Sequence, residues 1–168
     1  VLPTEYIEFG RPLETVLEQR EDRDVTWKAK ADWVAKMARG LQHAHSRGVV
    51  HRDLRPMNVV IAPGGVVKLV NFDLAKVEGS PLKYSDKQLR SRLDRRYVAP
   101  ETWRDPHVAD VRSDIYSLGA VFYELITSEP PYEDIEVVLE TFDETPFDRE
   151  LLMKELSTPG SEDFMASP

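Results

Sequence analysis

Residues 112–127 constrain the fold of this chain more than any other segment. Their pattern predicts a helix that ends before Pro130-Pro131. The apolar side chains are spread around nearly the whole helix: Ile115, Tyr116, Leu118, Ala120, Val121, Phe122, Leu125 and Ile126. A helix that is apolar all round must be surrounded by protein. We therefore expect it at the centre of a globular domain.

A second long helix is expected to begin after Thr26, a good N-cap, and to have Gly48 at its C′ position. Its inward stripe has three- and four-residue spacing: Trp33, Val34, Met37, Ala38, Leu41, Ala44 and His45. We interpret this stripe as core packing. His43 and His45 lack a third ligand at metal spacing, so we interpret both as ordinary helix residues.

Strand signals are short and few. Residues 59–61 and 66–70 flank the turn sequence A-P-G-G and predict a β-hairpin. Residues 4–9 predict a short strand, followed by a short helix over 13–19, and another short helix is expected near 148–156. The predicted fold class is mainly α with a small β-hairpin.

Composition narrows the function classes. The chain has 168 residues, enough for one core and one domain. Its 22 basic and 30 acidic residues give a net charge of −8, which argues against nucleic acid or membrane as a principal partner. No apolar run approaches the roughly 20 residues of a bilayer crossing. The absence of cysteine excludes thiolate chemistry and fits a reducing compartment, so we expect a cytoplasmic location.

The residues with the clearest chemical meaning form the stretch H-R-D-L-R-P-M-N at 51–58. His51, Arg52, Asp53, Leu54 and Asn58 fit the pattern H-R-D-L-x-x-x-N at every fixed position. Farther on, 97–101 read Y-V-A-P-E, and 113–119 read S-D-I-Y-S-L-G. In order and spacing these motifs resemble the C-terminal lobe of a protein kinase of the serine/threonine type. The likeness extends over about residues 4–130.

The resemblance implies a domain division. Residues 1–10 would be the hinge strand, 11–142 the C-lobe and 143–168 an acidic, partly frayed tail. Within the lobe we expect the catalytic loop at 51–58, the segment N-F-D at 71–73, A-P-E at 99–101 and the central helix at 112–127. The chain begins at Val1 with no glycine-rich loop, V-A-I-K lysine or partner glutamate before the hinge, so we expect a fragment.

The resemblance also implies residue roles. Asp53 would accept the proton of a substrate hydroxyl, and Arg55, in place of the usual lysine, would face the γ-phosphate of ATP. Asn58 would supply an oxygen to Mg²⁺. Arg52 would pair with a phosphorylated activation segment or belong to a buried ion-pair network, and Asp114 would anchor the catalytic loop.

The nucleotide's base would lie against the hinge in the same scheme. Backbone groups of Glu5 and Ile7 would meet the adenine edge, with Thr4 as gatekeeper and Val60 under the ring. The resemblance thus implies ATP and Mg²⁺ as cofactors.

The segment N-F-D stands where the family has D-F-G, 18 residues after Asp53. Asn71 keeps a carbonyl oxygen but loses the charge that a second Mg²⁺ ligand would bring. Asp73 replaces a glycine and is an alternative ligand, although the backbone aims it elsewhere. A plain turn is a third interpretation. We favour a weakened metal site, with Asn58 and Asn71 as its metal-binding residues.

Two further departures concern the end of the activation segment. Asp94 stands where a threonine is usual, and its carboxylate is expected to repel that of Asp53 unless one is protonated or turned away. Glu101 normally pairs with an arginine in the last helices of the lobe, and the tail offers no clear counterpart. Ser80, Tyr84, Ser85 and Ser91 are candidate phosphorylation sites, although Ser85 with Gln88 is better interpreted as a capping box.

These features predict a pseudokinase or interaction module. The alternative is a divergent active kinase that transfers the γ-phosphate of ATP to a protein substrate when its N-lobe is present. We expect weak or absent ATP and Mg²⁺ binding in this chain. An apolar hinge face around Tyr6, Ile7, Val60 and Leu69 is expected to be covered by an N-lobe or a partner protein.

Overall fold

The computed structural model describes residues 7–19, 21, 25–81 and 83–131. Its elements are mostly helical, with two small antiparallel sheets. The α-helices are α1 (Leu13–Glu18), α2 (Trp27–His45), α3 (Asp86–Arg90), α4 (Pro100–Arg104) and α5 (Val111–Thr127). The strands are β1 (Arg11–Pro12), β2 (Val49–Val50), β3 (Val59–Ala62), β4 (Val66–Leu69) and β5 (Lys76–Val77). Short 3₁₀ turns cover Pro56–Asn58 (η2), Pro63–Gly65 (η3) and Phe72–Leu74 (η4).

The predicted hairpin is confirmed. Strands β3 and β4 pair from Val59 opposite Leu69 to Ala62 opposite Val66. The turn between them needs left-handed backbone at Gly64 and Gly65, with φ of +75° and +71°. Strand β1 adds to the other edge of β3, and a second sheet joins β2 to β5.

Helix α2 begins as predicted, because the Thr26 hydroxyl oxygen accepts the Ala29 N–H. It ends earlier than expected: Ser46 is the C-cap, and Gly48, with φ of +68°, lies two residues beyond it. The helix packs on β4 where Gly40 faces the Leu69 side chain; a Cβ at position 40 would lie 3.1 Å from Leu69 Cδ1. Leu69 is consequently half-buried.

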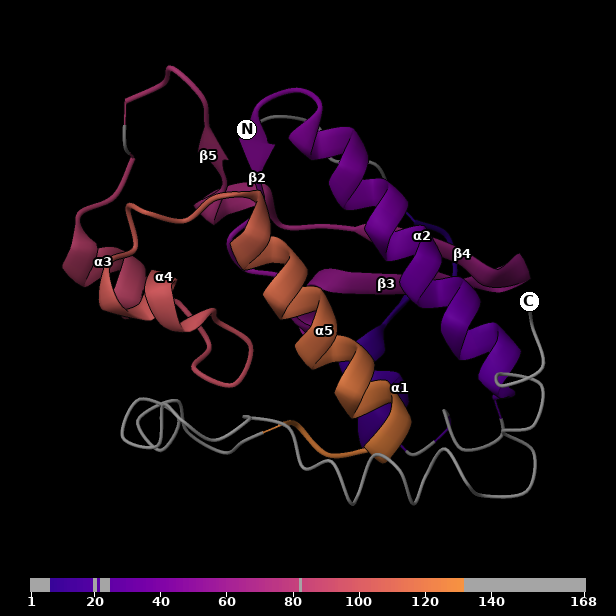
Figure 1. Cartoon of the computed structure of the whole chain (residues 1–168). Coiled ribbons are helices and arrows are strands. Elements are labelled where there is room, and N and C mark those ends of the chain that lie inside the picture. The colour runs from indigo at the N-terminus through magenta and orange to yellow at the C-terminus, as the bar shows by residue number, and fades with distance from the viewer. Residues whose placement is uncertain (1–6, 20, 22–24, 82, 132–168) are drawn as a thin grey trace, which may run out of the picture.

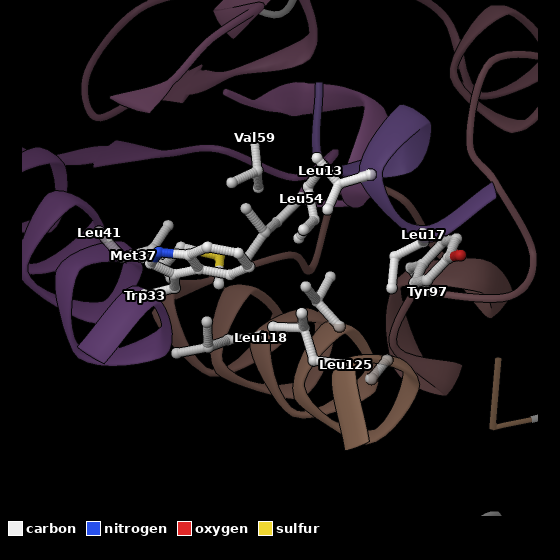
Figure 2. Packing of buried hydrophobic residues seen from close by; sticks show 13 residues of the cluster. Leu13, Leu17, Trp33, Met37, Leu41, Leu54, Val59, Tyr97, Leu118 and Leu125 are labelled. Carbon is white, nitrogen blue, oxygen red and sulfur yellow. The ribbon is translucent and has the colours of Figure 1, made fainter. Parts of the chain in front are cut away.

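Helix α5 forms a large part of the core, as predicted (Figure 1). Figure 2 shows Leu118 and Leu125 of α5 facing Leu54 and Val59, with Trp33 of α2 at one end of the cluster. The expectation that α5 is surrounded on all sides is wrong for its first turns, since Ile115 is 55% exposed. The apolar pattern did not distinguish side chains that point inward from one that projects from the helix.

Residues 7–10 form a turn, although a strand was predicted to extend through residue 9. The Gly10 N–H donates to the Ile7 carbonyl oxygen over 3.0 Å, and Phe9 has a φ of +54°. A bond that closes on a residue three positions back cannot also pair across strands. The remainder of the predicted strand and the predicted helix at 148–156 lie outside the described residues.

Helices α3 and α4 lie beside each other, on one side of the α2–α5 pair in Figure 1. Arg90 of α3 donates to the carbonyl oxygens of Trp103 and Arg104 at the end of α4. A second apolar cluster joins this region: Leu74, Leu89, Leu93 and Val98, with Tyr84 and Trp103 against it. Among the described helices, none is long and apolar enough to cross a lipid bilayer.

Candidate functional site

The loop at 51–58 is held from below by Asp114, a fully buried residue of α5. Its two carboxylate oxygens accept the backbone N–H groups of His51 and Arg52, each over 2.8 Å. Arg52 has a φ of +65°, a strained conformation for a residue with a side chain. The two hydrogen bonds to one rigid carboxylate provide the compensation such a conformation needs.

His45 is a further contact of Asp114 that sequence reasoning missed. Its Nε2 atom lies 2.7 Å from Asp114 Oδ2. His45 belongs to α2 as predicted, but no sequence pattern indicated that its ring would contact a buried carboxylate. The place of His45 in the inward stripe, four residues after Leu41, indicated that the side chain faces the core but not which group it would meet there.

His51 joins this loop to the segment at 71–73. The Asp53 N–H donates to His51 Nδ1 over 3.2 Å, which places the ring proton on Nε2, 3.1 Å from the Val70 carbonyl oxygen. The ring also packs against Phe72, with 4.5 Å between centroids. Burial lowers the pKa of His51, although Asp114 opposes this, so we assign a neutral imidazole.

Asp53, Asn58 and Asn71 come together at the centre of the site. Asn58 is buried, and its Nδ2 donates to the Asp53 carbonyl oxygen over 2.7 Å and to Asp53 Oδ2 over 2.8 Å. These two acceptors fix the orientation of the Asn58 amide, because only its NH₂ group can serve both. Asn58 Oδ1 then faces Asn71, whose Nδ2 donates to it over 3.1 Å.

Arg55 lies between two carboxylates. Its Nε is 3.3 Å from Asp53 Oδ1, an ion-pair distance without hydrogen-bond alignment, and its Nη1 donates to Asp94 Oδ2 over 3.3 Å. Burial raises the pKa of Asp53, while Arg55 and Asn58 oppose the shift.

Arg96 binds the same Asp94 carboxylate, with 2.8 Å between Nη2 and Oδ2. Burial by itself raises the pKa of Asp94, but the hydrogen bonds and charge of Arg96 and the charge of Arg55 outweigh it, so the pKa lies below its ordinary value. The expected repulsion between Asp94 and Asp53 is thus largely compensated by arginines.

Asp73 faces a different set of groups. It is exposed, and its carboxylate binds Lys83 Nζ, Tyr84 Oη and Arg92 Nη1. All three belong to the segment 83–92. The Asp73 carboxylate therefore binds residues of the segment 83–92, whereas the Asn58 amide oxygen accepts from Asn71.

The expected adenine-side residues lie partly within the described chain. Ile7 and Val60 both approach Gly10, where a Cβ would lie 2.6 Å from Ile7 Cγ2 and 2.7 Å from Val60 Cγ1. Their side chains are half-buried beside each other. Glu5, Thr4 and Tyr6 lie outside the described residues.

The structure also has a cavity of about 240 Å³ that the sequence pattern did not predict. It is lined by Glu14, Leu17, Glu18, Pro56, Arg96, Tyr97, Glu124 and Ser128. Tyr97 donates its hydroxyl to Glu124 Oε2 over 2.6 Å. Burial raises the pKa of both groups. The cavity adjoins the catalytic loop through Pro56.

Comparisons with known proteins agree with this arrangement. The family profile of the protein kinase domain matches residues 1–163. Serine/threonine-protein kinase PknA of Mycobacterium tuberculosis is 37% identical over 124 residues, covering 73% of this chain and 27% of that protein. A probable serine/threonine-protein kinase of Clostridium perfringens is 32% identical over 129 residues, covering 76% and 18%.

The probable kinase PknB of Corynebacterium glutamicum is 35% identical over 124 residues, covering 74% of this chain and 19% of that protein. The chain belongs to the protein kinase family, which confirms the resemblance read from its motifs. It spans about a quarter or less of the length of these relatives.

Proposed function

We propose that this chain is the C-terminal lobe of a serine/threonine-protein-kinase-like domain, that its catalysis is impaired at the metal position, and that it works in this form as a protein-interaction module. One observation carries the proposal: the Asn71 amide donates to Asn58 Oδ1. The family uses ATP with Mg²⁺, and these are the two side chains from which a metal ligand set is expected.

The donor set fits a divalent cation poorly. Mg²⁺ requires hard oxygens, mostly from carboxylates and substrate phosphates. Here the Asn58 oxygen already accepts an N–H, and an amide stands at position 71 where a carboxylate would attract the ion. The Asn71 N–H therefore donates to the Asn58 oxygen that would otherwise be available to a cation.

The interaction role follows from exposed apolar side chains near the hinge. Phe9 is 75% exposed, while Ile7, Val60 and Leu69 are half-buried. An N-terminal kinase lobe or a partner protein would cover this hinge face. The division into a hinge at 1–10, a lobe at 11–142 and an acidic tail at 143–168 belongs to the same proposal, as does the cytoplasmic location.

A second candidate is an active kinase that phosphorylates a protein hydroxyl once an N-lobe is present. The order of the catalytic loop favours it: Asp53 is held by Asn58 and Arg55, and arginines compensate Asp94. In that role Asp53 would accept the hydroxyl proton and Arg55 would face the transferred phosphoryl group. Glu5, Ile7 and Val60 would hold the adenine.

Calorimetric titration of ATP into the chain, with Mg²⁺ and with a chelator, tests the choice. The impaired form predicts weak binding that is the same in both buffers, because the protein supplies no metal carboxylate at position 71. Magnesium-dependent binding with a dissociation constant near 10 µM, about 7 kcal/mol, would favour the active kinase instead.

A further inference from the structure

Asp73 makes a compact set of contacts that neither candidate function uses. Lys83 Nζ lies 2.5 Å from Oδ1, while Tyr84 Oη and Arg92 Nη1 donate to Oδ2 over 2.9 and 2.8 Å. These donors come 10, 11 and 19 residues after Asp73, so one carboxylate closes a loop of the activation segment.

Lys83 and Arg92 both also lie close to the Tyr84 ring. Lys83 Nζ lies 4.9 Å from the centre of the Tyr84 ring, and the Arg92 guanidinium lies 4.5 Å from it. Both distances permit cation–π attraction. The Tyr84 ring therefore contacts two positively charged side chains, and both of these also bind the Asp73 carboxylate. We call Asp73, Lys83, Tyr84 and Arg92 the Asp73 clasp.

The clasp lies over the second apolar cluster. Leu74, the residue after Asp73, packs with Leu89 and Leu93, and Tyr84 lies against the same cluster. The apolar contacts bring the two ends of the segment together without specifying their alignment, because hydrophobic attraction is non-directional. The directional bonds to Asp73 provide that alignment.

Arg52 supplies an independent observation. In phosphorylation-controlled kinases, an arginine pairs with a phosphoryl group to order the activation segment. Here the Arg52 side chain is buried and donates from Nε to the Leu74 carbonyl oxygen over 2.6 Å and from Nη1 to the Pro106 carbonyl oxygen over 3.5 Å. Two backbone carbonyls thus accept hydrogen bonds from Arg52 in the unmodified protein, one of them at Leu74, next to Asp73.

We propose that Asp73 is a built-in anion that orders the activation segment without phosphorylation. Its carboxylate does for Lys83 and Arg92 what a phosphoryl group does in a phosphorylated segment, in a position where the related motif has glycine. The segment 83–92 is consequently held in the unmodified protein. This role does not depend on whether the site transfers phosphate.

Hydrogen exchange of the unphosphorylated chain, read by mass spectrometry over residues 83–93, tests the proposal. Asp73→Asn removes the charge, and Asp73→Ala also removes the acceptor. Each should speed exchange in this segment about three- to tenfold, because several exposed charge contacts are lost together. Glu78→Gln removes a negative charge from an exposed position outside residues 83–93 and should leave the exchange of residues 83–93 unchanged. Exchange in α2 and α5 reports whether a variant remains folded.

Salt provides a second readout. Raising the ionic strength to about 1 M shortens the screening length to about 3 Å, so exchange of residues 83–93 should rise in the parent protein and in Glu78→Gln but not in Asp73→Ala. Equal exchange in the parent and both Asp73 variants would overturn the proposal. So would fast exchange of this segment in the unphosphorylated parent that slows only on phosphorylation.

Discussion

The side-chain amide of Asn71 donates a hydrogen bond to Oδ1 of Asn58 over 3.1 Å. A carboxylate at position 71 has no hydrogen to donate, so two oxygens would face each other and attract a cation. In this chain the N–H group of Asn71 takes the place of that cation by donating to Asn58 Oδ1. The pair is locally satisfied, so the order of the catalytic loop is compatible with the weakened metal site that we propose.

The buried anchor of the catalytic loop should be the least replaceable polar residue described. Asp114→Asn turns one acceptor into an NH₂ group that faces an N–H donor, His51 or Arg52. We expect a loss of about 3–5 kcal/mol in the free energy of unfolding. Urea unfolding measures it, with Asp32→Asn as the control because the Asp32–Lys36 pair is at the surface. Equal stabilities of the two variants would contradict the anchoring role.

The carboxylate of Asp94 should stabilise the fold at neutral pH and lose this effect in acid. Its pKa is lowered in the folded protein, so the unfolded chain binds more protons as the pH falls. The contribution is complete above the ordinary value near 3.9 and disappears as the pH falls through the folded pKa. At pH 7, Asp94→Asn should cost about 1–2 kcal/mol, between surface and buried pairs.

Urea unfolding of Asp94→Asn and the parent at pH 7 and at pH 3 checks this. The difference in the free energy of unfolding should shrink at the lower pH. A difference that grows in acid would mean that Asp94 is repelled by Asp53 more than it is held by Arg55 and Arg96.

Replacing two different glycines by alanine should change the free energy of unfolding in opposite directions. In Gly10→Ala the new methyl would lie 2.6 Å from Ile7 Cγ2 and 2.7 Å from Val60 Cγ1, so we expect a loss of about 1–3 kcal/mol from overpacking. In Gly119→Ala, within α5, a Cβ meets no atom of the described residues within 4 Å, and we expect a gain of about 0.5–1 kcal/mol. Thermal unfolding of the pair tests both signs; destabilisation by Gly119→Ala would show that this face of α5 is covered.

Much of the fold follows from local signals. The A-P-G-G turn between two valine-rich runs specified the hairpin, and the Thr26 cap specified the start of α2. The capping box of Ser85 and Gln88 is also confirmed. Each depends on residues near one another in the sequence, where spacing fixes geometry.

The pairings across the fold were harder to anticipate. His45 meets Asp114 across 69 residues, and no local pattern encodes that contact. Asp94 was expected to oppose Asp53, since spacing alone does not show that arginines compensate it. The exposure of Ile115 was not predicted, because the apolar character of a helix does not show which of its faces neighbouring elements cover.

Divalent-ion binding by the Asn71 variants tests the central claim most directly. Water-proton relaxation measures Mn²⁺ bound by the chain in the presence of ATP, for the parent, Asn71→Asp and Asn71→Ala. We expect Asn71→Asp to bind Mn²⁺ at least about tenfold more tightly than the parent, a gain of about 1.4 kcal/mol. Asn71→Ala, which removes the amide without adding charge, should show no such gain. Binding in the parent that equals Asn71→Asp, and that Asp73→Asn abolishes, would contradict the account by making Asp73 the ligand.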